Sequence, residues 1–288
     1  MSQTRKAKFT PKVGFVHIGR TLFALAGLLF VNGCGTLSSA HPREGAGLSV
    51  DDDGVAYVRV GTRVPVVVLQ AGHQDGKKTW GKLVADLALQ NMVIATDRPG
   101  HGGNPATDAP RDPCTIAGEQ HKMLQVAGAP PPYILVGHSL GGLYQYAYAK
   151  LYPSDVAGIV LLDPTHPRHW ETMQREFPRG ADLIKLMRLV AFSSVDKKEF
   201  DAQAEYLNKL NLAQPLSIPA KLLVSGRFRP EERGKFENML KPLRQDWLQL
   251  LGAKRMQVVW DSGHYIQKDS PEEVVSAVQQ LISEIDLR

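Results

Sequence analysis

The chain has 288 residues, of which 43% are hydrophobic and 22% charged, an ordinary composition for a globular protein with a sizeable core. The formal net charge is +5, but five basic and no acidic residues lie in the first 33 positions, so the remainder balances 29 basic against 29 acidic residues. A neutral remainder argues against a nucleic-acid-binding surface. The two cysteines, Cys34 and Cys114, exclude a disulfide framework, and we expect Cys114 to be a lone, buried thiol.

The first 33 residues have the features of a signal peptide. Basic residues precede the apolar run from Leu22 to Val31, which is too short to span a bilayer comfortably. The segment Val31-Asn32-Gly33-Cys34 resembles a bacterial lipoprotein processing box, which implies an exported bacterial protein with a lipidated Cys34 that anchors it to a membrane. A plain secretory signal or an uncleaved anchor is the alternative. Residues 34–47 are interpreted as a flexible spacer.

Residues 48–288 alternate between apolar strands and helix-like segments. A hairpin over 48–60 opens this part, with Asp-Gly turn chemistry between its two strands. Helices are predicted around Trp80–Leu87, over Gly141–Leu151 and over Pro271–Ile285. The aliphatic runs that are typical of buried parallel strands are Val64–Leu69, Met92–Thr96, Tyr133–Val136, Val156–Asp163, Ala220–Ser225 and Met256–Trp260.

The segment Gly137-His138-Ser139-Leu140-Gly141 joins a predicted strand to a predicted helix. Glycines on both sides of a serine permit the strained backbone of a sharp turn, which presents the hydroxyl outside the fold. The amide of Leu140 lies at the helix N-terminus, where unpaired N–H groups favour a developing oxyanion. A glycine-rich turn without a catalytic role is the alternative, and the segments described next favour a nucleophile site.

Four segments follow predicted strands in a characteristic order: Gln70-Ala71-Gly72-His73, Asp97-Arg98-Pro99-Gly100-His101-Gly102, the turn at Ser139, and Ser262-Gly263-His264. This ordered set, over residues 48–288, resembles the α/β-hydrolase superfamily. The resemblance implies a mostly parallel central sheet flanked by helices, in agreement with the alternating pattern. It also implies a small helical lid over about 164–215, inserted after the strand that ends at Asp163.

Ser139 and His264 are the candidate nucleophile and general base. A serine hydroxyl needs an imidazole to take its proton and later return it to the leaving group. His264 lies after the last predicted strand, in the chain order that this superfamily uses. The resemblance implies that the backbone amides of His73 and Leu140 form the oxyanion hole. The histidines expected to be structural or on the surface are His101, His121, His138, His166 and His169.

The acidic member of a triad has more than one candidate. In most members of the superfamily it follows the strand that here is Ala220–Ser225, but the loop after that strand contains no aspartate. Asp163, one strand earlier, is one candidate, and Glu231 or Glu232 in the loop is the other. Some branches place the acid where Asp163 stands. We favour Asp163, because a carboxylate at the end of a buried strand is rigidly positioned.

Together these features predict a serine hydrolase that cleaves a carboxylic ester or related acyl bond through an acyl-enzyme intermediate. A serine nucleophile argues against the epoxide hydrolase and dehalogenase branches, which attack with an aspartate. Acyl transfer or perhydrolysis on the same acyl-enzyme is one alternative, and a non-catalytic ligand-binding module is another. We expect a small-molecule acyl substrate and neither metal nor other cofactor, since the sequence has no paired-histidine metal motif and no dinucleotide fingerprint.

Overall fold

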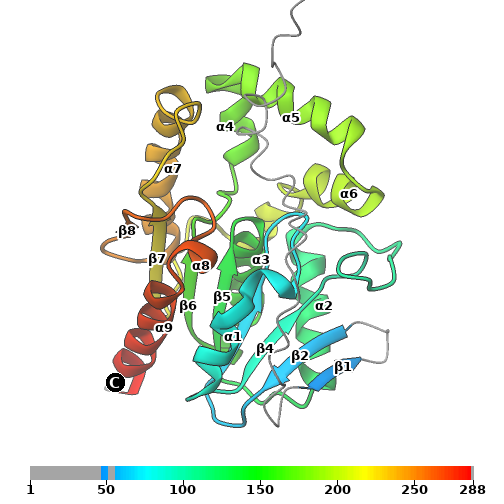
Figure 1. Ribbon diagram of the computed structural model, residues 1–288, viewed down its shortest axis with the longest axis vertical. Coiled ribbons are helices and arrows are strands. Elements are labelled where there is room, and N and C mark those ends of the chain that lie inside the picture. Colours follow the sequence, from blue (N-terminus) through cyan, green and yellow to red (C-terminus); the bar gives the residue numbers. More distant parts are fainter. Residues whose placement is uncertain (1–46, 51–55, 287–288) are drawn as a thin grey trace, which may run out of the picture.

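The computed structural model describes residues 47–50 and 56–286 (Figure 1). The predicted signal peptide, Cys34, most of the spacer and the turn of the hairpin lie outside these residues, so lipidation and export stay predictions. In the described part of the chain, no helix combines the length and the apolar character that a membrane span requires.

An eight-stranded sheet forms the centre of the protein (Figure 1). The strand order is β1-β2-β4-β3-β5-β6-β7-β8, in which β1, β2 and β4 pair antiparallel and all other neighbours pair parallel. The predicted hairpin and mostly parallel sheet are therefore confirmed. The strands are β1 (Gly47–Val50), β2 (Ala56–Val60), β3 (Val66–Gln70), β4 (Val93–Thr96), β5 (Tyr133–His138), β6 (Val156–Leu162), β7 (Ala220–Ser225) and β8 (Gln257–Val259).

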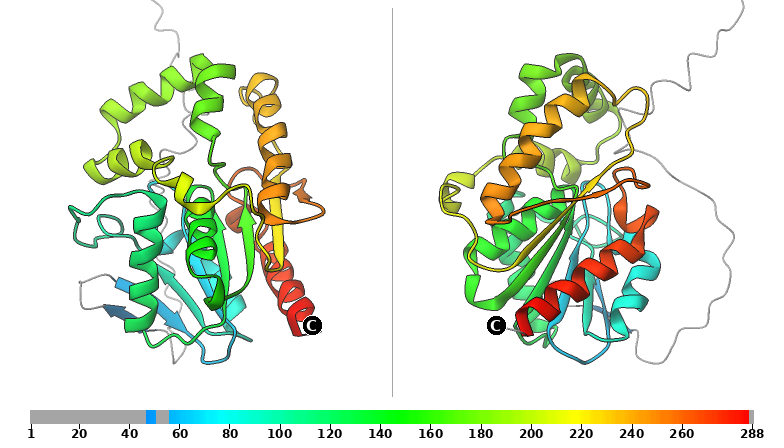
Figure 2. Two further views of the ribbon diagram at one scale, coloured as in Figure 1. Left: turned by 180° about the vertical axis from the view of Figure 1, so that it is seen from behind. Right: turned by 90° about the vertical axis from the view of Figure 1, so that its left-hand side faces the viewer.

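Helices cover both faces of the sheet (Figure 2). One face packs on α1 (Gly81–Ala88), α8 (Ile266–Asp269) and α9 (Pro271–Asp286), and the other on α2 (Pro113–Val126), α3 (Leu140–Leu151) and the second half of α7 (Lys235–Leu251). Successive strand side chains point to opposite faces, so Val67 and Val68 are both fully buried in different cores. This two-sided burial explains why the strands are continuous apolar runs.

A helical insertion follows β6, as predicted. It contains α4 (His169–Glu176), α5 (Pro178–Val190) and α6 (Ser194–Ala202), which lie beyond the carboxyl ends of the strands in Figure 1. Its small apolar core includes Met173, Ile184 and Phe192, together with Met239 from the first half of α7. Since the second half of α7 packs on the main core, this helix joins the insertion to the sheet.

Three details differ from the sequence-based expectations. The last strand is shorter than predicted, because the chain turns away after Val259 and leaves Trp260 exposed. The short helix α8 was not predicted. Cys114 is a free thiol on α2, but it is half-buried rather than buried, because it packs only at the edge of the main core.

Candidate active site

Ser139 occupies a strained turn between β5 and α3. Its backbone angles are φ 53° and ψ −124°, a conformation that L-residues rarely adopt. The adjacent glycines leave no space for side chains: a Cβ atom on Gly137 would lie 2.6 Å from the Gly141 carbonyl oxygen, and one on Gly141 would lie 2.2 Å from that of Gln70. The Ser139 amide donates to the carbonyl of Leu162 on β6 at 3.0 Å. The neighbouring strands therefore fix the turn.

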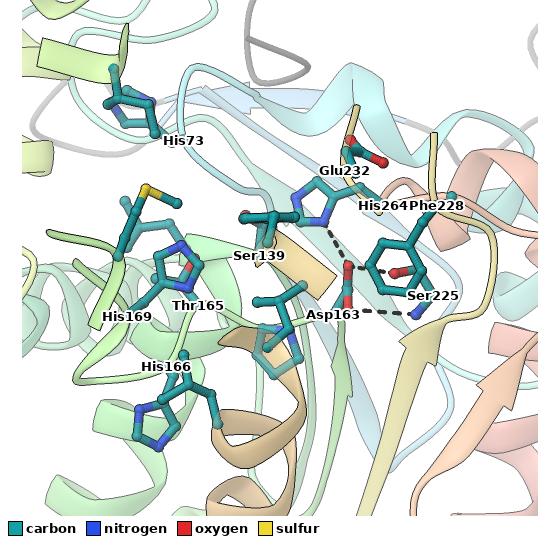
Figure 3. Close-up of a pocket in the computed structure, with 18 of the residues that line it drawn as sticks. His73, Ser139, Asp163, Thr165, His166, His169, Ser225, Phe228, Glu232 and His264 are labelled. Carbon is teal, nitrogen blue, oxygen red and sulfur yellow. Dashed lines mark hydrogen bonds and ion pairs between the residues drawn. The ribbon is translucent and has the colours of Figure 1, made fainter. Parts of the chain in front are cut away.

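His264 lies beside Ser139 and is hydrogen-bonded to Asp163 (Figure 3). The distance from His264 Nδ1 to Asp163 Oδ2 is 2.8 Å. Because an ionised carboxylate can only accept, Nδ1 carries the hydrogen, and the lone pair of Nε2 is free to act as a base. The Ser139 hydroxyl makes no hydrogen bond to His264 in the described structure, and such bonds commonly form only when substrate binds.

The structure brings Asp163, and neither glutamate, to His264. Glu231 is half-buried outside the pocket that contains Ser139. Glu232 lines that pocket, but its carboxylate accepts the backbone N–H of Arg229 at 2.9 Å. Asp163 follows β6 directly, with a φ of 42° that turns its side chain toward the end of the neighbouring strand β7.

Two residues that the sequence analysis did not identify hold Asp163. The Ser225 hydroxyl donates to Asp163 Oδ2 at 3.0 Å, and Arg244 Nη2 donates to Asp163 Oδ1 at 2.9 Å and to the Ser225 hydroxyl at 2.8 Å. Burial alone would raise the pKa of Asp163, but the hydrogen bond from His264 and the charge of Arg244 outweigh it and hold this pKa well below its usual range. Asp163 is therefore ionised at neutral pH.

Ser225 ends β7, the strand after which most superfamily members carry the acid. Here the hydroxyl at that strand end orients a carboxylate from the adjacent strand. Because β6 and β7 pair in parallel, their carboxyl ends lie side by side, and this pairing brings Ser225 to Asp163. Arg244 lies 81 residues beyond Asp163, in the middle of α7, and no local pattern marks it.

His138 supports His264 from behind. Its ring is buried, and Nε2 lies 2.9 Å from the backbone carbonyl oxygen of His264. Because a carbonyl only accepts, Nε2 carries the hydrogen. Burial, with the charge of His264, lowers the pKa of His138 well below its ordinary value, so the ring is neutral. The residue before Ser139 therefore positions the loop that carries His264.

The loop after β3 lies directly against the turn at Ser139. A Cβ atom on Gly72 would lie 3.0 Å from the Ser139 Cβ, so glycine permits this approach. Arg98 donates from Nη1 to the Ala71 carbonyl at 2.7 Å and from Nη2 to the Gly72 carbonyl at 2.9 Å. In a trans peptide the C=O and N–H point in opposite directions, so the bond to Gly72 directs the His73 amide away from Arg98.

The two amides predicted to form an oxyanion hole are free to donate a hydrogen bond to a ligand. Among the loop and cap hydrogen bonds of the described residues, neither the His73 nor the Leu140 amide donates to a backbone acceptor. The His73 ring lines the pocket, and its Nε2 donates to the carbonyl of Asp196 on α6 at 3.0 Å. Burial lowers the pKa of His73, which favours the neutral ring. This loop therefore contacts both the turn and the insertion.

A buried ion pair connects α6 to Arg98, which in turn bonds to the loop after β3. Arg98 donates from Nε and Nη2 to the two carboxylate oxygens of Glu199, each at 2.9 Å, and neither side chain is more than 3% exposed. His101 Nε2 lies 3.1 Å from the same carboxylate. Burial would raise the pKa of Glu199, but the charge of Arg98 and the close approach of His101 hold it well below its usual range. Glu199 was not identified from the sequence.

Ser139, Asp163 and His264 open onto a pocket of about 580 Å³ between the strand ends and the insertion. This volume is typical of small-molecule sites. Within the described residues, no group of three or more His, Cys, Asp or Glu side chains is arranged to hold a metal ion. The apolar wall of the pocket is formed by side chains that include Trp170, Met173, Ile184, Met187, Phe192 and Phe200.

A serine at a strained strand-to-helix turn, a histidine paired with a carboxylate, and a helical insertion above a mostly parallel sheet define the α/β-hydrolase class. The model of the alpha/beta hydrolase family matches residues 66–277, and the chain belongs to this family.

Known proteins similar to this chain include hydrolases. The uncharacterized protein YbdG of Bacillus subtilis is 27% identical over 124 residues, which cover 43% of this chain and 37% of YbdG. Human monoacylglycerol lipase ABHD6 is 31% identical over 104 residues, 35% of this chain and 30% of ABHD6. The matched segments thus span less than half of these relatives. The structure of epoxide hydrolase CorEH has a TM-score of 0.61 at 18% identity, covering 84% of this chain and 99% of CorEH, a likeness of fold.

Replacement of Glu199 by Gln is expected to lower the free energy of unfolding by about 3 kcal/mol, because it leaves the buried Arg98 without its countercharge. Urea unfolding followed by fluorescence measures this difference. The matched control is Glu205→Gln, since Glu205 is an exposed residue close to the same helix. Equal stability of the two variants would show that the ion pair does not hold α6.

Proposed function

We propose that the protein is a serine hydrolase that cleaves a carboxylic ester or related acyl bond. The observation that carries this proposal is the 2.8 Å hydrogen bond from His264 Nδ1 to Asp163, with the imidazole beside a serine held at φ 53°. This arrangement supplies a nucleophile, a base with a free Nε2 and a carboxylate that orients the base.

In the proposed reaction the Ser139 oxygen attacks the substrate carbonyl carbon while His264 Nε2 accepts the hydroxyl proton. The negative charge that develops on the carbonyl oxygen is stabilised by the amides of His73 and Leu140. The tetrahedral intermediate collapses, the bond to the leaving oxygen breaks, and His264 returns the proton to that oxygen. Water then attacks the acyl-enzyme by the same route and releases the acid.

The comparisons support this proposal in part. The monoacylglycerol lipase match is compatible with an acyl ester substrate, whereas the epoxide hydrolase likeness concerns the fold. The residue at the turn is Ser139, so the attacking group is a hydroxyl rather than a carboxylate. Acyl transfer uses the same acyl-enzyme with another acceptor, and product analysis with added alcohols separates the two reactions.

A fluorophosphonate probe tests the nucleophile directly. We expect one adduct per chain, located at Ser139 by peptide mass spectrometry, because the probe reacts with a serine activated by a neighbouring imidazole. Ser139→Ala is expected to give no adduct, and heat-denatured protein is the second control. Absence of labelling in the folded protein would instead favour a non-catalytic ligand-binding role.

A pair of isosteric variants tests the acid. Asp163→Asn is expected to lower kcat for a p-nitrophenyl ester by about 10³-fold or more, because the amide no longer fixes and stabilises the imidazolium. Glu231→Gln is expected to retain the activity of the unmodified protein, since Glu231 has no place in the pocket. The reverse order of effects would assign the acid to the loop after β7.

Arg244→Met is expected to shift the acid limb of the pH profile of kcat/KM upward, by about 0.5 pH unit. Arg244 lowers the pKa of Asp163 and competes with His264 for its negative charge. Without Arg244 the carboxylate stabilises the protonated imidazole more strongly, so a higher pH is needed to obtain the neutral base.

The control for this experiment is Arg233→Met, which removes an exposed arginine that also lines the pocket. Its profile is expected to match that of the unmodified protein. If Arg244→Met lowers kcat but leaves the pH profile of kcat/KM unchanged, Arg244 does not act on the imidazole through its charge and has only a structural role.

A further inference from the structure

A second imidazole faces the pocket on the side of Ser139 away from His264 (Figure 3). It belongs to His169, the first residue of α4, and Thr165 lies next to it. The Thr165 amide donates to the carbonyl oxygen of Ser139 at 2.9 Å, which fixes Thr165 against the nucleophile turn. The sequence analysis assigned His169 a structural or surface position, but the structure places it in the pocket.

His169 differs from the other histidines around Ser139 because its side chain makes no hydrogen bond to any described residue. The rings of His73 and His138 each donate to a backbone carbonyl, and His166 Nδ1 accepts the backbone N–H of Arg168 at 3.0 Å. Burial, with the charge of His264, lowers the pKa of His169 to about 4. The ring is therefore neutral at neutral pH, with one donor and one acceptor available.

Thr165 adds a second free polar group at the same place. Thr165 lines the pocket, and its hydroxyl makes no hydrogen bond to any described residue. Beyond this pair the wall becomes apolar, with Met173, Met187 and Phe192 supplied by the insertion. The lining of the pocket therefore changes from polar side chains near Ser139 to apolar side chains farther away.

The chemistry of acyl transfer decides which part of a substrate meets this pair. The leaving oxygen must face His264, because that ring returns its proton, and the carbonyl oxygen must face the amides of His73 and Leu140. The remaining substituent on the reacting carbon is the acyl chain, and the side of Ser139 that faces away from His264 is the one lined by Thr165 and His169. The first carbons of the acyl chain therefore lie against the polar pair.

We propose that the substrate is an ester whose acyl group carries a hydroxyl or keto oxygen within two or three bonds of the scissile carbonyl, bound by His169 and Thr165. The inference rests on the serine hydrolase function proposed above. An acyl chain without this oxygen would displace water from two polar groups and leave both unpaired, which penalises it relative to the oxygenated analogue. The apolar wall is left for the remainder of the acyl group.

The test compares p-nitrophenyl esters of butanoic, 2-hydroxybutanoic, 3-hydroxybutanoic and 2-oxobutanoic acid, corrected for spontaneous hydrolysis. At least one oxygenated ester is expected to exceed the butanoate in kcat/KM by about 10-fold or more. His169→Phe keeps an aromatic ring without nitrogen, and Thr165→Val keeps the volume without the hydroxyl. Each is expected to reduce this ratio several-fold, and the double variant is expected to bring it close to the ratio of the rates at which hydroxide cleaves the same two esters.

The ratio of two esters within one variant does not depend on the fraction of folded protein, so partial misfolding leaves the test valid. His121→Asn is the control, because His121 lies on α2 against Tyr148 and Tyr152, away from the pocket, and its ratio is expected to equal that of the unmodified protein. Labelling of Ser139 by a fluorophosphonate without a preference for an oxygenated ester beyond its reactivity toward hydroxide, or a preference that is undiminished in the double variant, would overturn this inference alone. Absence of labelling would overturn the proposed function itself.

Discussion

The close approach of three strand ends at Ser139 is the constraint on which the site depends. The turn is bonded to β6 through the Ser139 amide and lies so close to β3 that Gly141 has no room for a Cβ atom. Ser139, the loop that carries His73, and Asp163 all belong to these adjacent strands or directly follow them. A rigid parallel sheet therefore places groups that are far apart in the chain within reach of one substrate.

The carboxylate beside His264 stands one strand away from its most common position in the superfamily, and its surroundings account for this. A buried Asp163 needs compensating hydrogen bonds and positive charge, which Ser225 and Arg244 provide. The usual site at the end of β7 retains a polar side chain, now as a donor to the carboxylate. Because Arg244 shares Asp163 with His264, the same contact that stabilises the carboxylate also sets how strongly it attracts a protonated imidazole.

The sequence alone predicted the parts of the structure that depend on a local pattern of residues. Continuous aliphatic runs predicted the buried strands, and glycines around Ser139 predicted the turn, because both effects act within a few residues. Asp163 was favoured but not decided, since the choice required the neighbour of β6 in the sheet. Arg244 and Glu199 act through contacts made only when the insertion and α7 fold over the strand ends, and single charged residues on helices carry no signal of such contacts. His169 lines the pocket only because the insertion places α4 beside the strand ends.

The attachment of the insertion limits how the pocket can open. On one side α6 is held by the buried Glu199 ion pair and by the bond from His73 to Asp196, so moving it would disturb the loop that carries His73. On the other side α5 packs on the small apolar cluster of the insertion and pairs with α6 through Arg188 and Asp201 near the surface, and it exposes Leu189 and Val190. Elements with few buried contacts open at the lowest free energy. The only direct bond from the described insertion to the His73 ring comes from α6, so a displacement of α5 disturbs the His73 loop less than a displacement of α6 does.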